Sequence, residues 1–347
     1  MIEQFKEQIR AAAAQQRPLR IRGGGTKDWY GGALAGEILD TRGHSGIVDY
    51  EPTELVITAR CGTPLAEIEA VLAQQNQMLA FEPPHFGEGA TFGGAIAAGL
   101  SGPRRANSGA VRDFVLGAQL MDGKGELLNF GGQVMKNVAG YDVSRLLAGS
   151  LGTLGLITEL SVKVLPRALL DATLRFEVSE IEAIRMLNLW GGQPLPLSAS
   201  CWHQGVLMLR LAGAQAAVDA AVKSLGGQVV ADADGFWASL REQHHAFFAG
   251  DAPLWRLSVP STTGAIVLNG EQLIEWGGAQ RWLRASSNEA ETIRSAVRAV
   301  GGHATLFRGG EKSVGVFQSL APAVARIHER LKAAFDPAHI FNPGRMY

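Results

Sequence analysis

Glycine constrains this chain more than any other residue type. Four glycine-dense stretches lie in its first half, each beside an expected strand or helix start, at residues 23–25 and in the segments from Gly87, Gly109 and Gly149. The 43 glycines of the 347-residue chain follow no collagen-like repeat, so we expect tight turns and close backbone approaches. Bare backbone can approach a phosphate and present consecutive N–H groups to it. A single stretch would indicate no more than a turn, but the four together predict a long ligand held largely by main-chain atoms.

Two common phosphate-binding motifs are absent from the sequence. The P-loop pattern GxxxxGK[ST] does not occur, which excludes kinases and ATPases of that type. The dinucleotide fingerprint GxGxxG also fails, because its nearest approach, at Gly87 and Gly89, places Phe92 where the last glycine belongs. The sequence therefore predicts a phosphate-bearing ligand that neither motif binds.

Charge and cysteine content exclude several other functions. The formal net charge is −1 and charged residues make up 19% of the chain, which argues against a nucleic acid partner. Cys61 and Cys201 form no CxxC pair, so we expect no iron–sulfur cluster, no metal site and no disulfide scaffold. Charged residues interrupt residues 1–16, unlike a signal peptide, and no run approaches the roughly 20 apolar residues of a membrane helix. These features predict a soluble, cytoplasmic protein.

The first half alternates expected strands and helices. Residues 19–21 predict a strand that runs directly into the first glycines, and a second strand ends at Gly62. Thr63 is expected to cap the following helix, with Pro64 at its first helical position. Residues 114–130 predict a β-hairpin, because two apolar runs flank a turn sequence.

The pattern changes after Pro166. A strand is followed by Ser179 and Glu182, which predict a capping box that opens a helix. Two strands then form an expected hairpin at residues 204–205, and a helix and a further strand follow. This β-α-β-β-α-β order predicts a split βαβ sandwich with its helices on one face. We place the main domain boundary near residues 166–170.

Three ordered motifs resemble one flavoprotein superfamily. They are IRGGGTKDWYGG, PPHFGEGATFGGAIAAGLSGPRRANSGAVRDFVLG and KNVAGYDVSRLLAGSLGTLGLITEL. Their order and spacing resemble the FAD-binding domain of the vanillyl-alcohol oxidase / p-cresol methylhydroxylase flavoproteins. Within that superfamily the chain is similar to the family of FAD-binding E subunits of bacterial glycolate oxidases. The match covers the first half, and the tail FDPAHIFNPGRMY resembles the family's ending.

The resemblance implies a fold and a domain organisation. The fold class is α+β, with a two-part FAD-binding domain of this type and an α/β cap domain that contains an antiparallel sheet. Residues 1–167 would bind FAD, and residues 168–325 would form the cap that meets substrate or partner. Residues 326–347 would form a C-terminal segment that returns to the FAD domain.

The resemblance also implies where FAD binds. The first loop would wrap the diphosphate through backbone amides, the second motif would pack against diphosphate and flavin, and the third would border the adenosine side. The implied cofactor residues are Arg22, Gly23, Gly24, Gly25, Thr26, Lys27, Pro83, Thr91, Phe92, Gly93, Gly94, Gly99, Ser108, Gly109, Gly152, Thr153 and Ile157. Leu151 replaces a glutamate common in the family and receives no role, and Ser108 replaces a common tyrosine. Thr26 and Lys27 stand where relatives with covalent FAD often carry histidine, so non-covalent FAD is expected.

No catalytic base can be named from the sequence. The histidine-rich segment typical of relatives that oxidise D-2-hydroxy acids is absent. Two candidates have alternatives: Arg345 is a cation for the substrate carboxylate or a surface arginine, and His303 is a flavin-facing group or a core residue. His244 and His245 are expected on one helix, as a packed face rather than a metal site.

The resemblance implies an FAD-binding subunit of a glycolate (2-hydroxy acid) oxidase or dehydrogenase complex, which converts glycolate to glyoxylate. Its implied partners are a second flavoprotein subunit with a fuller substrate site and an iron–sulfur subunit that carries electrons onward. Any contact with the inner face of the cell membrane would be made through these partners. Two alternatives stay open: a self-sufficient FAD-dependent oxidoreductase, and a structural subunit with a non-catalytic flavin.

Overall fold

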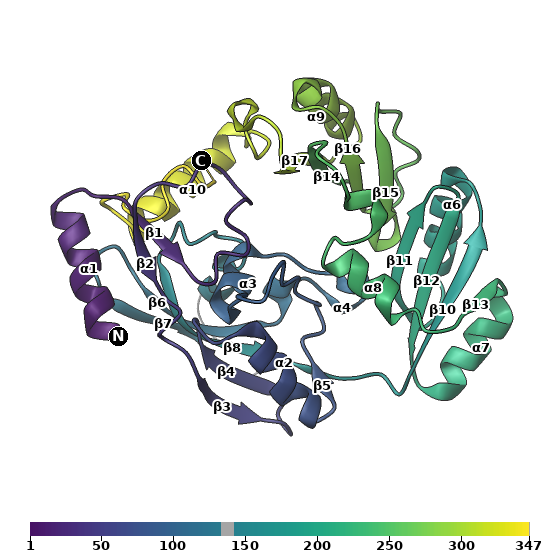
Figure 1. Cartoon of the computed structure of the whole chain (residues 1–347), viewed down its shortest axis with the longest axis horizontal. Helices are drawn as coiled ribbons and strands as arrows, with labels where there is room; N and C mark the ends of the chain where they lie inside the picture. Colours follow the sequence, from purple (N-terminus) through teal and green to yellow (C-terminus); the bar gives the residue numbers. More distant parts are fainter. Residues whose placement is uncertain (133–141, 347) are drawn as a thin grey trace. The chain divides into compact units, whose positions relative to one another are not determined.

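The chain folds into two compact units in the computed structural model, which describes residues 1–132 and 142–346 (Figure 1). Unit 1 comprises Met1–Leu100, Ala110–Pro166 and Ser319–Tyr347, and unit 2 comprises Ser101–Gly109 and Arg167–Gln318. The segment Ser101–Gly109 belongs to the second sequence motif, yet it packs with unit 2. The start of the third motif, residues 136–141, lies outside the described residues.

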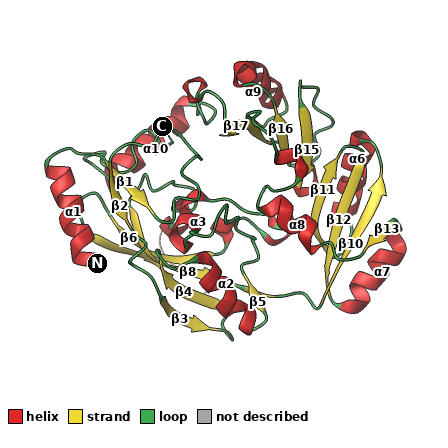
Figure 2. Cartoon of the chain, in the orientation of Figure 1, coloured by secondary structure: helices red, strands yellow, loops and turns green. Residues whose placement is uncertain are grey.

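A five-stranded antiparallel sheet forms the centre of unit 1, with strand order β3-β4-β8-β6-β7 (Figure 2). The strands are β3 (Ile47–Glu51), β4 (Val56–Arg60), β8 (Leu156–Lys163), β6 (Val115–Met121) and β7 (Leu127–Gly131). The buried apolar side chains of β4, β6 and β8 form one core with those of α2 (Leu65–Gln74) and α3 (Phe92–Ala98). Because α3 is part of this closely packed core, the loops at its two ends are attached to a rigid element.

The expected hairpin is confirmed as β6 and β7, which pair antiparallel. Asp122 stabilises the turn, because its Oδ1 accepts hydrogen bonds from the Lys124 and Glu126 backbone N–H groups at 2.9 and 2.8 Å. The expected helix cap at Thr63 is wrong. The N-cap of α2 is Pro64, and the Thr63 hydroxyl instead donates to the Arg60 carbonyl at 2.7 Å. Thr63 is thus committed to the turn before the helix.

The two ends of the chain meet in unit 1. Strand β1 (Leu19–Arg22) pairs in parallel with β2 (Glu37–Asp40), and α1 (Ile2–Ala14) buries Phe5 and Ile9 beside them. The C-terminal helix α10 (Pro322–Phe335) leads into a tail that runs along β1. The Leu19 N–H donates to the Ile340 carbonyl at 2.7 Å, and the Asn342 N–H donates to the Leu19 carbonyl at 2.9 Å. Unit 1 also contains β5 (Gln77–Met78), β9 (Leu165–Pro166) and α5 (Val143–Leu146).

Unit 2 is built on an eight-stranded antiparallel sheet of order β13-β10-β12-β11-β15-β16-β14-β17. Its strands are β10 (Leu170–Glu177), β11 (Leu197–His203), β12 (Val206–Gly213), β13 (Gln228–Val230), β14 (Leu254–Ser258), β15 (Glu271–Glu275), β16 (Gln280–Arg284) and β17 (His303–Arg308). Helices α6 (Glu180–Gly191) and α7 (Gln215–Leu225) bury their apolar residues against β10 and β12, and α9 (Ala290–Ala299) does so against β14, β16 and β17. The predicted β-α-β-β-α-β order is confirmed by β10 to β13.

Two local predictions in unit 2 need correction. Ser179 caps α6 by accepting a hydrogen bond from the Glu182 N–H at 3.3 Å, but the Glu182 carboxylate pairs with Arg185 at 2.6 Å rather than completing a capping box. The two adjacent histidines do not lie on a helix. Helix α8 (Asp234–Arg241) ends before them, and the His245 Nδ1 accepts from the Phe247 N–H at 3.2 Å to cap a single 3-10 turn.

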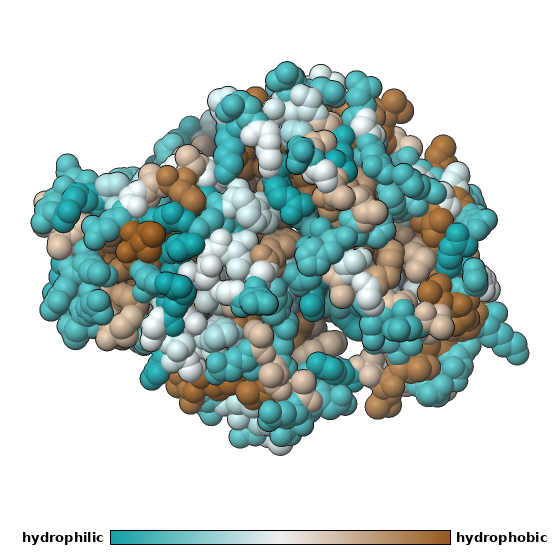
Figure 3. Space-filling view, in the orientation of Figure 1, coloured by the Kyte–Doolittle hydropathy of each residue, from teal (hydrophilic) through white to brown (hydrophobic). Residues whose placement is uncertain are grey.

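Apolar side chains on the visible surface form separate patches among polar ones (Figure 3). Large exposed apolar residues occur in both units, for example Ile327 on α10 and Val229 on β13. Within the described residues, every helix is too short or too polar to span a bilayer.

Candidate functional site

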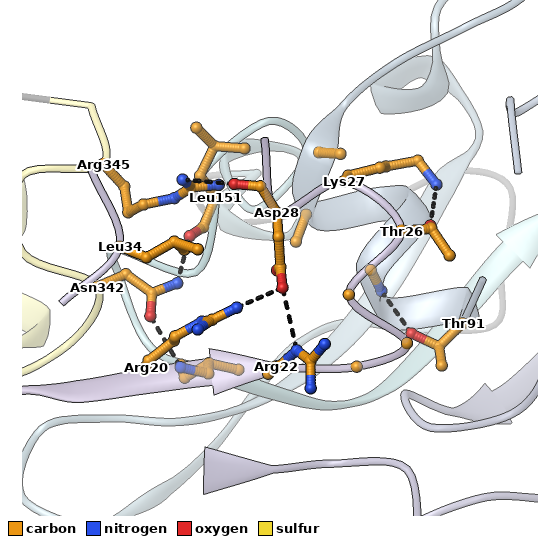
Figure 4. A pocket seen from close by; sticks show the side chains of 17 residues that line it. Arg20, Arg22, Thr26, Lys27, Asp28, Leu34, Thr91, Leu151, Asn342 and Arg345 are labelled. Atoms are coloured by element: carbon orange, nitrogen blue, oxygen red, sulfur yellow. Dashed lines mark hydrogen bonds and ion pairs between the residues drawn. The ribbon is translucent and has the colours of Figure 1, made fainter. Parts of the chain in front are cut away.

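Two cavities of about 100 and 80 Å³ adjoin each other in unit 1, because six residues line both. We call the two together the glycine cleft. The shared lining residues are Ile21, Gly23, Gly94, Ala97, Leu151 and Asn342. The cleft thus lies between β1, the loop that follows it, α3, the loop before β8 and the C-terminal tail (Figure 4).

The first two glycines of the 23–25 loop leave space that neighbouring atoms of the protein occupy. A Cβ atom on Gly23 would lie 2.3 Å from the Thr91 Oγ1, and one on Gly24 would lie 1.5 Å from the Gly89 carbonyl oxygen. Gly25 has a φ of +74°, in the left-handed region that favours glycine. The glycines therefore let the first loop pack onto the second motif. The backbone of this tightly packed loop forms one wall of the cleft.

Positive charge gathers in the cleft around one carboxylate (Figure 4). The Arg22 Nε donates to the Asp28 Oδ2 at 3.0 Å, and Arg20 forms an ion pair with the same oxygen. The Arg20 Nε is buried and has no hydrogen-bond partner among the described residues. Lys27 also lines the cleft, and its Nζ donates to the His85 carbonyl at 3.1 Å. With Arg345, four cations line the cleft beside the single carboxylate of Asp28.

The C-terminal tail joins the loops that wall the cleft. The Asn342 Nδ2 donates to the Leu151 carbonyl at 2.6 Å, and its Oδ1 accepts from the Ile21 N–H at 2.8 Å. The Arg345 Nη1 donates to the carbonyls of Asp28 at 3.1 Å and Gly32 at 2.7 Å, and its Nη2 donates to the Tyr30 carbonyl. Burial lowers the pKa of Arg345, although the nearby Asp28 opposes this effect. The tail thus holds the 28–32 loop and the 151–155 loop against β1.

A buried ion pair anchors the tail itself. The Lys332 Nζ lies 2.6 Å from the Asp336 Oδ2 and donates to the carbonyls of Thr153 and Phe341 at 2.7 and 2.8 Å. Asp336 is 0% exposed and accepts from the backbone N–H groups of Ile340 and Phe341. Burial lowers the pKa of Lys332, and the hydrogen bond to Asp336 counteracts that shift. Each charge is therefore paired and hydrogen-bonded.

Many of the residues expected to contact a cofactor line the cleft. These are Arg22, Gly23, Gly24, Gly25, Thr26, Lys27, Thr91, Gly93, Gly94, Gly152 and Ile157. The others line neither cavity. Pro83 and Phe92 are buried, and Gly99 ends α3. Thr153 donates to the Ser150 carbonyl, and Ser108 and Gly109 belong to unit 2.

The two catalytic candidates lie in different units. Arg345 lines the cleft, but the residue is only 6% exposed. Its guanidinium group donates hydrogen bonds to three backbone carbonyls. It is thus neither a surface arginine nor a cation free of protein partners. His303 is the first residue of β17 in unit 2 and does not line the cleft.

Several cleft residues escaped the sequence analysis, among them Arg20, Asp28, Leu151 and Asn342. Arg20 and Asp28 lie beside the glycines and carry charge, which was an available signal. Leu151 adopts a φ of +52°, unusual for a branched residue, and lines both cavities. Asn342 lies 321 positions from its partner Ile21, so local sequence patterns could not pair them.

The cleft fits a nucleotide with a diphosphate. Its net charge is positive, one buried arginine N–H lacks a partner among the described residues, and a glycine backbone forms one wall. Arginine and backbone N–H groups are typical ligands of phosphate oxygens. Cys61 also lines the cleft, where burial raises the pKa of its thiol to about 12 and so keeps it protonated.

Several known proteins are similar to this chain in amino-acid sequence. The family described as "FAD binding domain" matches residues 1–131. The Escherichia coli protein "Glycolate oxidase subunit GlcE" is 51% identical over 341 residues, which cover 98% of this chain and 96% of that protein. "Glycolate oxidase subunit GlcD" of Bacillus subtilis is 32% identical over 48% of this chain and 36% of its own length. "D-lactate dehydrogenase" of Archaeoglobus fulgidus is 32% identical over 48% of this chain and 37% of its own length.

A solved structure shares the fold. Alkyldihydroxyacetonephosphate synthase superposes with a TM-score of 0.68 at 14% identity, covering 98% of this chain and 75% of that one. This likeness and the observed sheets confirm the expected α+β fold class. The family match and the GlcE relative confirm FAD as the cofactor.

Proposed function

The chain belongs to the family of glycolate oxidase GlcE subunits, and from this premise we propose that it is the FAD-binding subunit of a complex that oxidises glycolate to glyoxylate. The observation that carries the proposal is the positively charged glycine cleft, whose glycine loop and α3 lie in residues 1–131, the region that matches an FAD-binding domain. Residues 1–167 would hold the cofactor together with the C-terminal tail. Residues 168–325 would serve as the cap.

In this proposal the chain's own residues bind and orient the cofactor. FAD, when bound, would supply the acceptor for the hydride that leaves the hydroxyl-bearing carbon of the substrate with both electrons. Arg20, Arg22 and the backbone of residues 23–25 would hold its diphosphate, while Leu151 and Gly152 would border the rest of the nucleotide. Asn342 and Arg345 would keep both loops in position.

The states of Asp28 and Cys61 in the cleft support the proposal that partner subunits supply the proton transfer. Oxidation of the hydroxyl group also requires a base that removes its proton. Asp28 is committed to two arginines, and Cys61 is protonated because of its raised pKa. We therefore assign the base to a residue outside the glycine cleft, and the fuller substrate site to a second flavoprotein subunit. An iron–sulfur partner would receive the electrons, and the two free thiols suit the reducing cytoplasm.

Anaerobic reduction of the flavin tests this function. The purified chain should show a flavin absorption spectrum and should keep it when glycolate is added. Co-expression with the second flavoprotein subunit should allow glycolate to bleach the flavin. Bleaching of the isolated chain would establish a self-sufficient oxidoreductase, and a colourless chain that FAD cannot reconstitute would indicate a structural subunit.

Replacing Arg20 with methionine should weaken FAD binding about tenfold or more, because a charged hydrogen bond contributes about 1.5–3 kcal/mol. Alanines in the glycine loop would be less informative, since they would clash with Thr91 and Gly89 and distort the loop. Titration with FAD, ADP and riboflavin separates the causes. The loss should affect FAD and ADP, which contain the diphosphate, and spare riboflavin.

Arg17 provides the matched control for this variant. It is exposed and lies just before β1, so Arg17→Met should bind all three ligands as the parent chain does. Unchanged FAD affinity in Arg20→Met would remove Arg20 from the diphosphate site.

A further inference from the structure

A separate cavity of about 230 Å³ lies within unit 2, at the start of β14. Two arginines line it, Arg284 from β16 and Arg308 from β17. Both strands flank β14, and Leu254 is the backbone partner of Arg284 on one side and of Arg308 on the other. Two strand spacings separate the backbones of these arginines by about 10 Å. Their long side chains therefore frame one cavity at one level of the sheet.

Arg284 is held in place by its surroundings. Its Nη1 donates to the Phe247 carbonyl at 3.2 Å. Gly250 has a φ of +87°, and a Cβ atom there would lie 2.8 Å from the Arg284 Nη2. The glycine thus makes room for the guanidinium group. The remaining side-chain N–H groups of Arg284 have no hydrogen-bond or ion-pair partner within the part of the chain that the structure describes.

The cavity keeps an excess of positive charge. Burial lowers the pKa of Arg308, but arginine stays protonated at neutral pH in proteins. Asp251 also lines the cavity, yet it is exposed and forms no ion pair among the described residues. Solvent therefore screens the carboxylate of Asp251 more strongly than the half-buried guanidinium groups.

We propose that this cavity binds a small oxyanion, a carboxylate or a phosphate, between Arg284 and Arg308. Guanidinium groups match the paired oxygens of both anions and form two parallel hydrogen bonds to them. A water molecule occupies about 30 Å³ of liquid, so the cavity has room for an acid of a few carbon atoms. The site is built within unit 2 from β14, β16 and β17, and it involves none of the residues of the glycine cleft.

Calorimetric titration of the full-length chain tests the proposal. Glyoxylate, glycolate and inorganic phosphate are the probes, each added at low ionic strength to the parent chain and to Arg284→Met and Arg308→Met. We expect saturable binding of at least one probe and a loss of about tenfold or more in each variant. Arg284→Lys keeps the charge without the planar fork and should lose less affinity than Arg284→Met.

Arg185 on α6 supplies the control, because it is exposed and engaged with Glu182. Arg185→Met should bind each probe like the parent chain. Urea denaturation followed by circular dichroism reports whether the variants are folded. FAD titration of the same variants keeps this test separate from the proposed function, because FAD binding to unit 1 should be unchanged. Preferential binding of a carboxylate or of phosphate identifies the source of the oxyanion. Absence of binding, or binding that survives both methionine substitutions in folded protein, would overturn the proposal.

Discussion

Replacing Lys332 with methionine should lower the free energy of unfolding by about 3–5 kcal/mol, because it leaves a buried carboxylate without its counter-ion. Asp336 is completely buried, and Lys332 is only 7% exposed. The substitution also removes the donor that joins the carbonyls of Thr153 and Phe341. The 151–155 loop and the C-terminal tail would lose one of the side chains that join them.

Urea denaturation followed by circular dichroism measures this effect. Lys124→Met is the matched control, since Lys124 is exposed in the β6–β7 turn of the same unit and should change stability by less than about 0.5 kcal/mol. If Lys332→Met unfolds at the same urea concentration as the control, the buried pair does not stabilise the tail.

Replacing Arg345 with methionine should weaken FAD binding by about tenfold or more. The guanidinium group donates to the carbonyls of Asp28, Tyr30 and Gly32, and a methionine leaves these acceptors without their donor. The 28–32 loop would then be free to move, and Asp28, the anchor of Arg20 and Arg22, lies within it. Arg345 therefore acts here as a positioning residue.

Fluorescence titration with FAD and limited proteolysis distinguish this role from a direct contact. Loop release should speed cleavage near residues 28–32 even without FAD, whereas loss of a cofactor contact alone would leave cleavage unchanged. Arg326→Met on the exposed side of α10 should match the parent chain in both measurements. Parent-like affinity and cleavage in Arg345→Met would show that the tail does not organise the cleft.

Local patterns predicted much of the secondary structure because they depend on neighbours in the chain. The β6–β7 hairpin follows from two apolar runs around a turn, and the start of α6 follows from Ser179. The same reasoning failed at Thr63, whose hydroxyl is used by the preceding turn, and at His245, which caps a 3-10 turn instead of lying on a helix. In each failure, a competing nearby backbone group decided the conformation.

The cleft was predictable in part for the same reason. Motif resemblance identified the glycine loop and, from α3, the lining residues Gly93 and Gly94, since those residues are consecutive. It did not indicate that Gly24 packs against Gly89, that Arg20 and Arg22 share Asp28, or that Ser101–Gly109 packs with unit 2. These facts concern contacts between separate segments.

The amino-acid sequence by itself determined the β-α-β-β-α-β order of the second half, because periodicity and turn residues act over a few positions. The α+β class and the FAD-binding role of the glycine motifs came from their resemblance to a flavoprotein superfamily, which is also carried by consecutive residues. Only the tertiary structure decided how the tail closes the cleft. Asn342 meets Ile21 and Leu151, and Arg345 meets the 28–32 loop, across more than half of the chain. Such pairings depend on how the sheet and helices pack, and the residues around each partner carry no local trace of them.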